Sequence, residues 1–173
     1  MARTQPDYNT LPGFYTGYVK LVEQMDVMEA LMRSAESMQA FAGTIPEAKG
    51  EFRYAQDKWS IKELFCHVMD AERIFAYRAL RFARADETEL PGFDENKYAP
   101  LANAHARTIA HLSAEMKRLR DSTIDLFQSF TPAMLQCAGK ANGNLISVVN
   151  LGYVIAGHET HHRKIIAERY LSV

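Results

Sequence analysis

The 173-residue sequence has few cysteines and no long hydrophobic run. Its two cysteines, Cys66 and Cys137, are too few for a disulfide scaffold and are typical of a reducing compartment. No segment approaches the roughly 18–20 uninterrupted apolar residues of a membrane span. The opening MARTQPDYNT lacks the apolar core of a signal peptide. We therefore expect a cytoplasmic protein with no membrane partner.

The sequence also lacks an excess of charge of one sign. Its 20 Lys and Arg residues face 21 Asp and Glu residues, for a formal net charge of -1. A protein that tracks phosphates along a nucleic acid carries a strongly basic surface, so no nucleic-acid partner is expected. The 47% hydrophobic and 24% charged fractions exclude a disordered chain. A length of 173 residues suits a single domain spanning residues 1–173.

Sparse proline and glycine leave four long segments with helical periodicity and little alternation of the β type. The pattern predicts helices over about 15–41, 60–85, 103–130 and 145–170, the second opened by a capping box at Ser60 and Glu63. Thr131 and Pro132 predict a short helical turn, and Asn142-Gly143 predicts a turn with positive φ. In the first segment the apolar stripe consists of Tyr18, Leu21, Met25, Met28 and Met32.

Four helices that each carry one apolar stripe bury those stripes economically by packing side by side. We therefore predict an all-α fold, a four-helix bundle whose connections are longer than a minimal bundle needs. The connection at 86–100 is long enough to cover one end of a pocket, with Phe93 and Tyr98 as apolar walls. The alternative is a plain surface connection whose aromatic side chains only seal the bundle.

The most informative stretch is Gly-His-Glu-Thr-His-His at 157–162. On a helix, His158 and His162 are four residues apart and share one face, where they continue the apolar stripe. Buried imidazoles are unfavourable unless each finds a partner, and a divalent metal satisfies both at once. The alternative is a group of charged side chains at the favourable end of the helix dipole. His161 competes with His162 as ligand or lies at the rim of the site.

A tight site needs a third ligand, and His67 is the best candidate because it lies on the core-facing arc of the second helix. Three histidines with one open position are typical of a catalytic metal rather than a structural one. His111 lies off the stripe of its helix, and nothing else recommends His105. Cys66 points about 100° away from His67 around the helix, so we interpret it as a small apolar filler.

His158 to His162 also satisfies the H-E-x-x-H pattern of zinc peptidases, in which Glu159 would be the general base. The context does not favour a peptidase. Ile165 and Glu168 stand where the extended metzincin motif needs glycine and histidine, and no strand is predicted that would bind an extended peptide.

Four stretches in register resemble the DinB-like (DinB/YfiT-type) superfamily of metal-binding four-helix bundles. They are KWSIKE at 58–63 leading to His67, DAERIFAYRAL at 70–80, LPGFDE at 90–95 and GHETHH at 157–162. The resemblance covers nearly the whole chain from about Tyr15 onward. It implies one divalent metal, nickel or zinc, held by His67, His158 and His162.

The resemblance also implies an activity, because characterised relatives include thiol-dependent transferases and isomerases that use bacillithiol, mycothiol or glutathione. We expect a metal-dependent thiol S-transferase whose partners are a small-molecule thiol and an electrophilic substrate, in a homodimer. The alternative is a non-enzymatic metal- or small-ligand-binding bundle of a stress response. Glu159 and Asp70 are candidates to orient the histidine rings. Trp59 precedes the capping box, where a packing role is expected.

Overall fold

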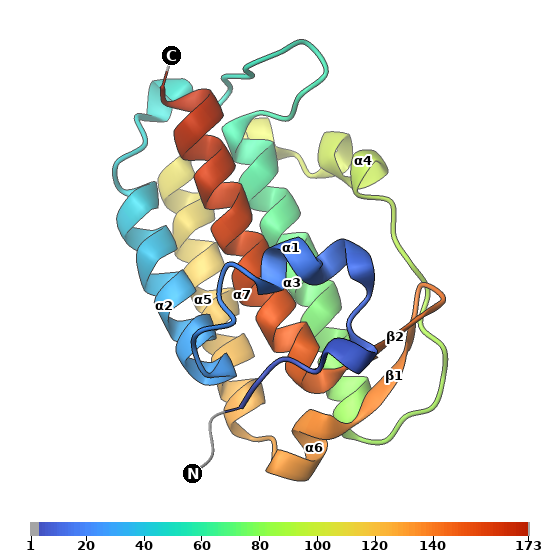
Figure 1. The fold of residues 1–173 in the computed structure, drawn as a ribbon. Helices are drawn as coiled ribbons and strands as arrows, with labels where there is room; N and C mark the ends of the chain where they lie inside the picture. Colours follow the sequence, from blue (N-terminus) through green and yellow to red (C-terminus); the bar gives the residue numbers. More distant parts are fainter. Residues whose placement is uncertain (1–3, 173) are drawn as a thin grey trace.

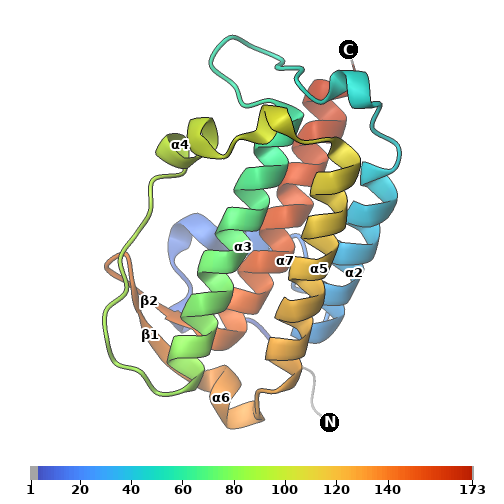
Figure 2. The same cartoon turned by 180° about the vertical axis from the view of Figure 1, so that it is seen from behind.

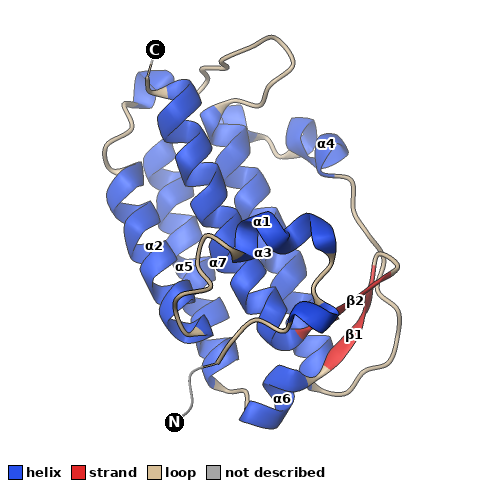
Figure 3. Cartoon of the chain, viewed as in Figure 1, coloured by secondary structure: helices blue, strands red, loops and turns tan. Residues whose placement is uncertain are grey.

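The computed structural model describes residues 4–172 and contains the predicted four-helix bundle (Figures 1 and 3). Residues 1–3, which belong to the N-terminal segment compared above with a signal peptide, and Val173 lie outside this range. Within it, no helix is both long enough and apolar enough to cross a membrane. The four long helices are α2 (Val27–Ala42), α3 (Ile61–Ala83), α5 (Ile109–Gln128) and α7 (Val148–Ile165), which continues as a π-helical turn, Ile166–Tyr170.

The shorter elements occupy the connections. They are the helices α1 (Thr16–Val19), α4 (Glu95–Tyr98) and α6 (Pro132–Gln136), and the strands β1 (Ala138–Ala141) and β2 (Asn144–Ser147). The capping box that opens α3 is present, because Glu63 N donates to Ser60 Oγ at 3.2 Å and Ser60 N donates to Glu63 Oε2 at 2.7 Å. Thr131 caps α6, as its sequence predicts.

The order of the helices around the bundle explains the long connections. Both α2 and α3 pack against α5 and α7, so helices that follow one another in the chain lie diagonally at two of the three connections. Figures 1 and 2 show that α3 and α5 run in the same direction, opposite to α2 and α7. The connection 84–108 must therefore return along the whole 23-residue α3, a rise of about 34 Å. On this path it passes beside the β1–β2 hairpin and carries α4.

The prediction of one continuous helix over 15–41 is wrong, because the chain turns before Asp26. Asp26 has extended backbone angles, and its carboxylate accepts a hydrogen bond from Met28 N at 3.0 Å, so it caps the start of α2. The segment before it, including α1, packs across α7 instead. The predicted stripe is also displaced, since Met32 is 41% exposed while Val27 and Leu31 are fully buried.

The last two long helices begin later than predicted. Asn103 adopts a left-handed conformation with φ 51°, and α5 starts only at Ile109, after the capping Thr108. The last helix, α7, starts only at Val148, because residues 145–147 belong to β2, which pairs with β1 in an antiparallel hairpin. The predicted turn is confirmed, with φ 52° at Asn142 and 73° at Gly143. A bridge between Leu90 and Ala141 attaches the long connection to this hairpin.

The core consists of two apolar clusters with a buried polar layer between them. Each long helix contributes one residue to the layer, namely Ser34, Glu72, Arg120 and Glu159. Arg120 donates from Nε to Glu72 Oε1 at 2.8 Å, and its Nη2 lies 3.2 Å from Glu159 Oε2. Its Nη1 donates to Ser34 Oγ at 2.6 Å. Burial would lower the pKa of Arg120, but the carboxylates of Glu159 and Glu72 raise it above the ordinary value.

Candidate metal centre

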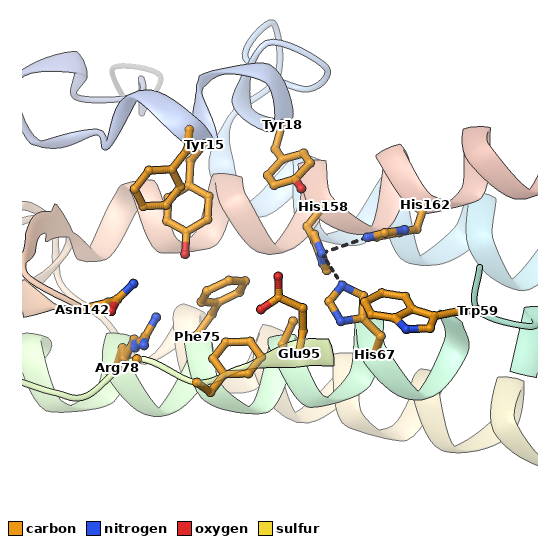
Figure 4. Close-up of a pocket in the computed structure, with 14 residues that line it drawn as sticks. Tyr15, Tyr18, Trp59, His67, Phe75, Arg78, Glu95, Asn142, His158 and His162 are labelled. Carbon is orange, nitrogen blue, oxygen red and sulfur yellow. Dashed lines mark hydrogen bonds between the residues drawn. The ribbon is translucent and has the colours of Figure 1, made fainter. Parts of the chain in front are cut away.

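Three histidines from two helices converge where α3 packs against α7 (Figure 4). The Nε2 atom of His158 lies 3.0 Å from Nε2 of His67 and 3.1 Å from Nε2 of His162. Two nitrogens that bind the same zinc ion tetrahedrally at about 2.0–2.1 Å lie about 3.3 Å apart, so these separations are close to those of ligands that share a cation. The structure thus brings together the three residues that the sequence selected, one from α3 and two from α7.

The three imidazoles are neutral at physiological pH, as metal ligands must be. Burial lowers the pKa of His67 to about 4, against an opposing effect of Glu95. For His162, burial and the neighbouring His67 and His161 lower the pKa to about 3. His158, which is 6% exposed, has its pKa lowered well below the usual value by burial first and then by His162 and His67. The Nδ1 of His162 is buried with no hydrogen-bond partner in the described part of the chain.

A cavity of about 400 Å³ opens beside the histidine cluster. Aromatic rings form much of its wall. The ring centres of Trp59 and His67 are 4.7 Å apart, and those of Tyr18 and His158 are 5.2 Å apart. Trp59 therefore contacts the site, beyond the packing role expected from its sequence position. The residues that line the cavity are Phe14, Tyr15, Tyr18, Trp59, His67, Ala71, Phe75, Arg78, Gly92, Phe93, Glu95, Asn142, His158 and His162.

Gly157 allows the N-terminal segment to form one wall of this cavity. A Cβ atom at Gly157 would lie 2.2 Å from the carbonyl oxygen of Tyr18, closer than any side chain permits. The missing side chain lets the backbone of α1 contact α7 directly, immediately before His158. Tyr18 is thereby placed between His158 and His161, with its ring 5.1 Å from the ring of His161.

Glu159 has a different role from either one proposed for it. Its side chain is 1% exposed and bound to Arg120 in the polar layer, on the side of α7 that faces the core. The expectations that it orients a histidine ring or acts as the general base of an H-E-x-x-H peptidase are therefore wrong. Adjacent helical residues point about 100° apart, which separates Glu159 from His158.

The other expected neighbours divide between the cavity and its surroundings. Phe93 lines the cavity, whereas Tyr98 is 46% exposed and lines a separate pocket with Asp70. Asp70 pairs with Arg73 at 3.3 Å, so the prediction that it orients a histidine is not supported. His161 is half-buried beside His162, at the rim, and lines a neighbouring pocket.

Two cysteines and two histidines lie away from the cluster. Cys66 is buried in one apolar cluster, where burial raises the pKa of its thiol, and Cys137 packs against the other. Neither cysteine lines the cavity. His105 and His111 are exposed, in agreement with the weak case that the sequence makes for them.

Sequence reasoning placed Tyr18 only in an apolar stripe, and it missed four other polar residues of the cavity: Tyr15, Arg78, Glu95 and Asn142. Three of them lie on the N-terminal segment, the long connection and the hairpin turn, whose approach to α3 depends on tertiary structure. Arg78 alone had a local signal, since it stands three turns after His67 on the same face of α3. Figure 4 shows the Glu95 side chain directed into the space near His67 and His158.

Comparison with known proteins agrees with this architecture. The sequence matches the family model of the DinB superfamily over residues 30–166, a range that includes all three clustered histidines. A similar solved structure is YfiT from Bacillus subtilis, described as a probable metal-dependent hydrolase with an unusual four-helix bundle topology. The two chains share 13% identity with a TM-score of 0.72, over 99% of this chain and 94% of YfiT. No curated protein matches the sequence.

Proposed function

The chain belongs to the DinB superfamily, and from this premise we propose that it is a metal-dependent enzyme of the thiol S-transferase type. Its substrates would be a low-molecular-weight thiol, of the bacillithiol, mycothiol or glutathione kind, and a small electrophile. The observation that carries the proposal is the convergence of three neutral imidazole Nε2 atoms, that of the buried His158 and those of His67 and His162, at the wall of a 400 Å³ cavity.

The donor set fits a single divalent metal, for which nickel and zinc are the candidates. Within residues 4–172 the cluster contains three side chains, His67, His158 and His162, and no carboxylate or thiolate joins it as a fourth ligand. This arrangement supports an enzyme rather than a closed structural site, because the cavity side stays accessible to a substrate. A divalent metal held there would lower the pKa of a coordinated thiol or water and so supply a nucleophile at neutral pH.

Side chains of the cavity would carry out the proton transfers that accompany this reaction. In a thiol transfer the S–H bond breaks, a C–S bond forms, and the leaving group departs with its bonding pair. Glu95 is the carboxylate of the cavity and is placed to accept the thiol proton and return it to the leaving group. Since neither Cys66 nor Cys137 lines the cavity, the reacting sulfur arrives with the substrate.

A second candidate is hydrolysis, and the position of Glu95 also favours it. The same carboxylate would take a proton from an attacking water, and YfiT is described as a probable metal-dependent hydrolase. A peptidase that uses Glu159 is not proposed, because that carboxylate is bound to Arg120.

Product analysis separates the two reactions. Metal-loaded protein is incubated with monochlorobimane and each thiol in turn, and separately with p-nitrophenyl acetate, and the products are identified by mass spectrometry. A thiol conjugate formed above the rate of metal-stripped protein supports the transferase, whereas ester hydrolysis alone supports the hydrolase. Stoichiometric metal without either product supports a non-enzymatic binding protein.

Two variants on α4 test the role of Glu95. Glu95→Gln should lower the rate roughly 100-fold, the usual contribution of a general acid or base, with metal content unchanged. Lys97→Gln is the matched control, because Lys97 is exposed on the same short helix and does not line the cavity. Equal rates in Glu95→Gln and the native protein would exclude Glu95 as the proton carrier.

A further inference from the structure

We propose that Arg78 forms an anion-binding subsite at the end of the cavity away from the histidines, and that the substrate carries a carboxylate there. This inference rests on the proposed function in one respect: it takes the cavity to be the substrate site. Figure 4 shows Arg78 and Asn142 together at one end of the cavity, with the histidine cluster at the other.

Arg78 is a buried cation without a protein counter-charge. Its residue is 4% exposed, and its Nη2 donates to the carbonyl oxygen of Pro91 at 2.8 Å. Among the described residues no ion pair includes Arg78, whereas the other buried arginine, Arg120, has two carboxylates. A guanidinium has five N–H donors, so the hydrogen bonds to Pro91 and to the Tyr15 side chain leave donors for a ligand. A buried unpaired charge is unfavourable, and an anionic ligand would compensate it.

The neighbours of Arg78 are neutral groups suited to an anion. The hydroxyl of Tyr15 points into the cavity near the guanidinium, and the carboxamide of Asn142 lies beside it (Figure 4). Burial raises the pKa of Tyr15 while Arg78 opposes the shift, so the phenol keeps its proton and can donate it in a hydrogen bond. The ring of Phe75 lies 5.8 Å from the guanidinium carbon and separates this end from the histidines.

The spacing along α3 defines the shape of the ligand. His67 and Arg78 are eleven residues apart, which corresponds to three helical turns and about 16 Å. Both line the cavity, with Ala71 and Phe75 on the same face between them. The ligand is therefore an elongated molecule with an apolar middle, a reactive group at one end and an anion at the other. A carboxylate matches the single charge of Arg78, whereas a phosphate dianion would leave one charge uncompensated.

The first test uses metal-stripped protein, so that it does not depend on the metal. Binding of hexanoate, hexanol and hexyl phosphate is measured by calorimetry. We expect hexanoate to bind at least 10-fold more tightly than hexanol, as a charge-assisted hydrogen bond provides, and more tightly than hexyl phosphate. Equal binding of hexanoate and hexanol would overturn the proposal, and tighter binding of hexyl phosphate would assign the subsite to phosphate instead.

Three variants locate the effect. Arg78→Gln should remove the preference for hexanoate over hexanol, and Arg78→Lys should retain part of it because the charge remains without the planar fork. Arg73→Gln is the matched control, since Arg73 is exposed on α3 and outside the cavity. Circular dichroism and a thermal melt verify that each variant is folded. A preference that survives in folded Arg78→Gln would overturn the assignment.

A second arm keeps this inference distinguishable from the proposed function. Mercaptohexanoate and mercaptohexanol are titrated into cobalt-loaded protein, and the visible absorption band reports whether sulfur reaches the metal. A hexanoate preference without a change in this band supports the Arg78 subsite and counts against the thiol-transferase proposal. A change in the band that is equal for the two thiols supports the thiol-transferase proposal and counts against the Arg78 subsite.

Discussion

His158 and Glu159 are adjacent in the chain but lie on different faces of α7, about 100° apart around the helix. His158 meets His67 and His162 at the cavity, while Glu159 binds Arg120 inside the bundle. The cluster and the polar layer thus lie at the same level of the fold, on two different faces of α7. Because Arg120 also binds Glu72 on α3, the layer fixes the rotation of both helices that carry the histidines.

The polar layer should make a large contribution to stability through its charge balance. Arg120→Met leaves Glu72 and Glu159 buried without a counter-charge, and we expect the free energy of unfolding to fall by about 3–5 kcal/mol in urea denaturation. Lys117→Ala is the control on the same helix, since its pair with Asp121 is exposed and worth about 0.5 kcal/mol.

A variant that removes all three charges tests whether uncompensated buried charge causes this loss of stability. Arg120→Met combined with Glu72→Leu and Glu159→Leu should recover most of the lost stability, because apolar replacement of a whole buried ion cluster is often neutral or stabilising. If the triple variant were less stable than Arg120→Met alone, uncompensated charge would not be the cause of the loss.

The three histidines should be required together for metal binding. Replacing His67, His158 or His162 by Ala removes one of three converging Nε2 donors, so elemental analysis should show loss of stoichiometric metal in each variant. His111→Ala is the control, because His111 is exposed and outside the cluster. Full metal retention in folded His67→Ala would remove that residue from the ligand set.

The histidine cluster was predictable because its signal is local. Two of its members are one turn apart on an apolar stripe, and His67 lies on the apolar arc of a helix with a clear capping box. Helix packing alone then brings the stripes together. By contrast, Asn142 reaches the cavity only because Leu90 bridges Ala141, a contact between segments about fifty residues apart that leaves no periodic pattern.

The errors also have physical causes. The break before α2 depended on one capping carboxylate, Asp26, within a methionine-rich run that also fits a continuous helix. Arg120 lies on the buried stripe with Met116 and Thr123. From sequence alone an arginine is predicted to be exposed, because its two acidic partners lie on other helices and cannot be identified. Glu159 was misplaced for the same reason.

The stability of the metal-free protein should fall in acid. The pKa of His67 is lowered to about 4 and that of His162 to about 3, whereas in the unfolded chain both titrate near 6.5. Below about pH 6.5 the unfolded chain therefore binds more protons than the folded one, and stability decreases as pH falls toward 3–4. Each group contributes at most about 1.4 kcal/mol per pH unit.

The measurement compares urea midpoints of metal-stripped protein at pH 7.5 and pH 5.0, two conditions chosen to bracket the ordinary histidine pKa of about 6.5. We expect a lower midpoint at the acidic condition, and a smaller difference in His162→Leu, which has one titrating imidazole fewer. His111→Gln is the matched control variant, since His111 lies outside the cluster. Identical midpoints at the two pH values would contradict the lowered pKa values.

The direct contact between the α1 and α7 backbones should make Gly157 intolerant of any side chain. In Gly157→Ala the new Cβ would lie 2.2 Å from the backbone oxygen of Tyr18, and backbone cannot rotate away as a flexible side chain does. The α1 segment must then move outward, which we expect to lower the free energy of unfolding by about 1–3 kcal/mol. The movement also takes Tyr18 from His158, so ligand affinity in the cavity should decrease.

Gly17 provides the matched control because it belongs to the same segment. A Cβ atom there meets nothing within 4 Å, and Gly17 lies inside α1, where alanine is favoured over glycine by about 1 kcal/mol. Gly17→Ala should therefore leave stability unchanged or slightly raised, with ligand affinity and metal content as in the native protein. If Gly157→Ala were as stable as Gly17→Ala and bound hexanoate equally well, the α1 segment would not be held against α7 by this contact.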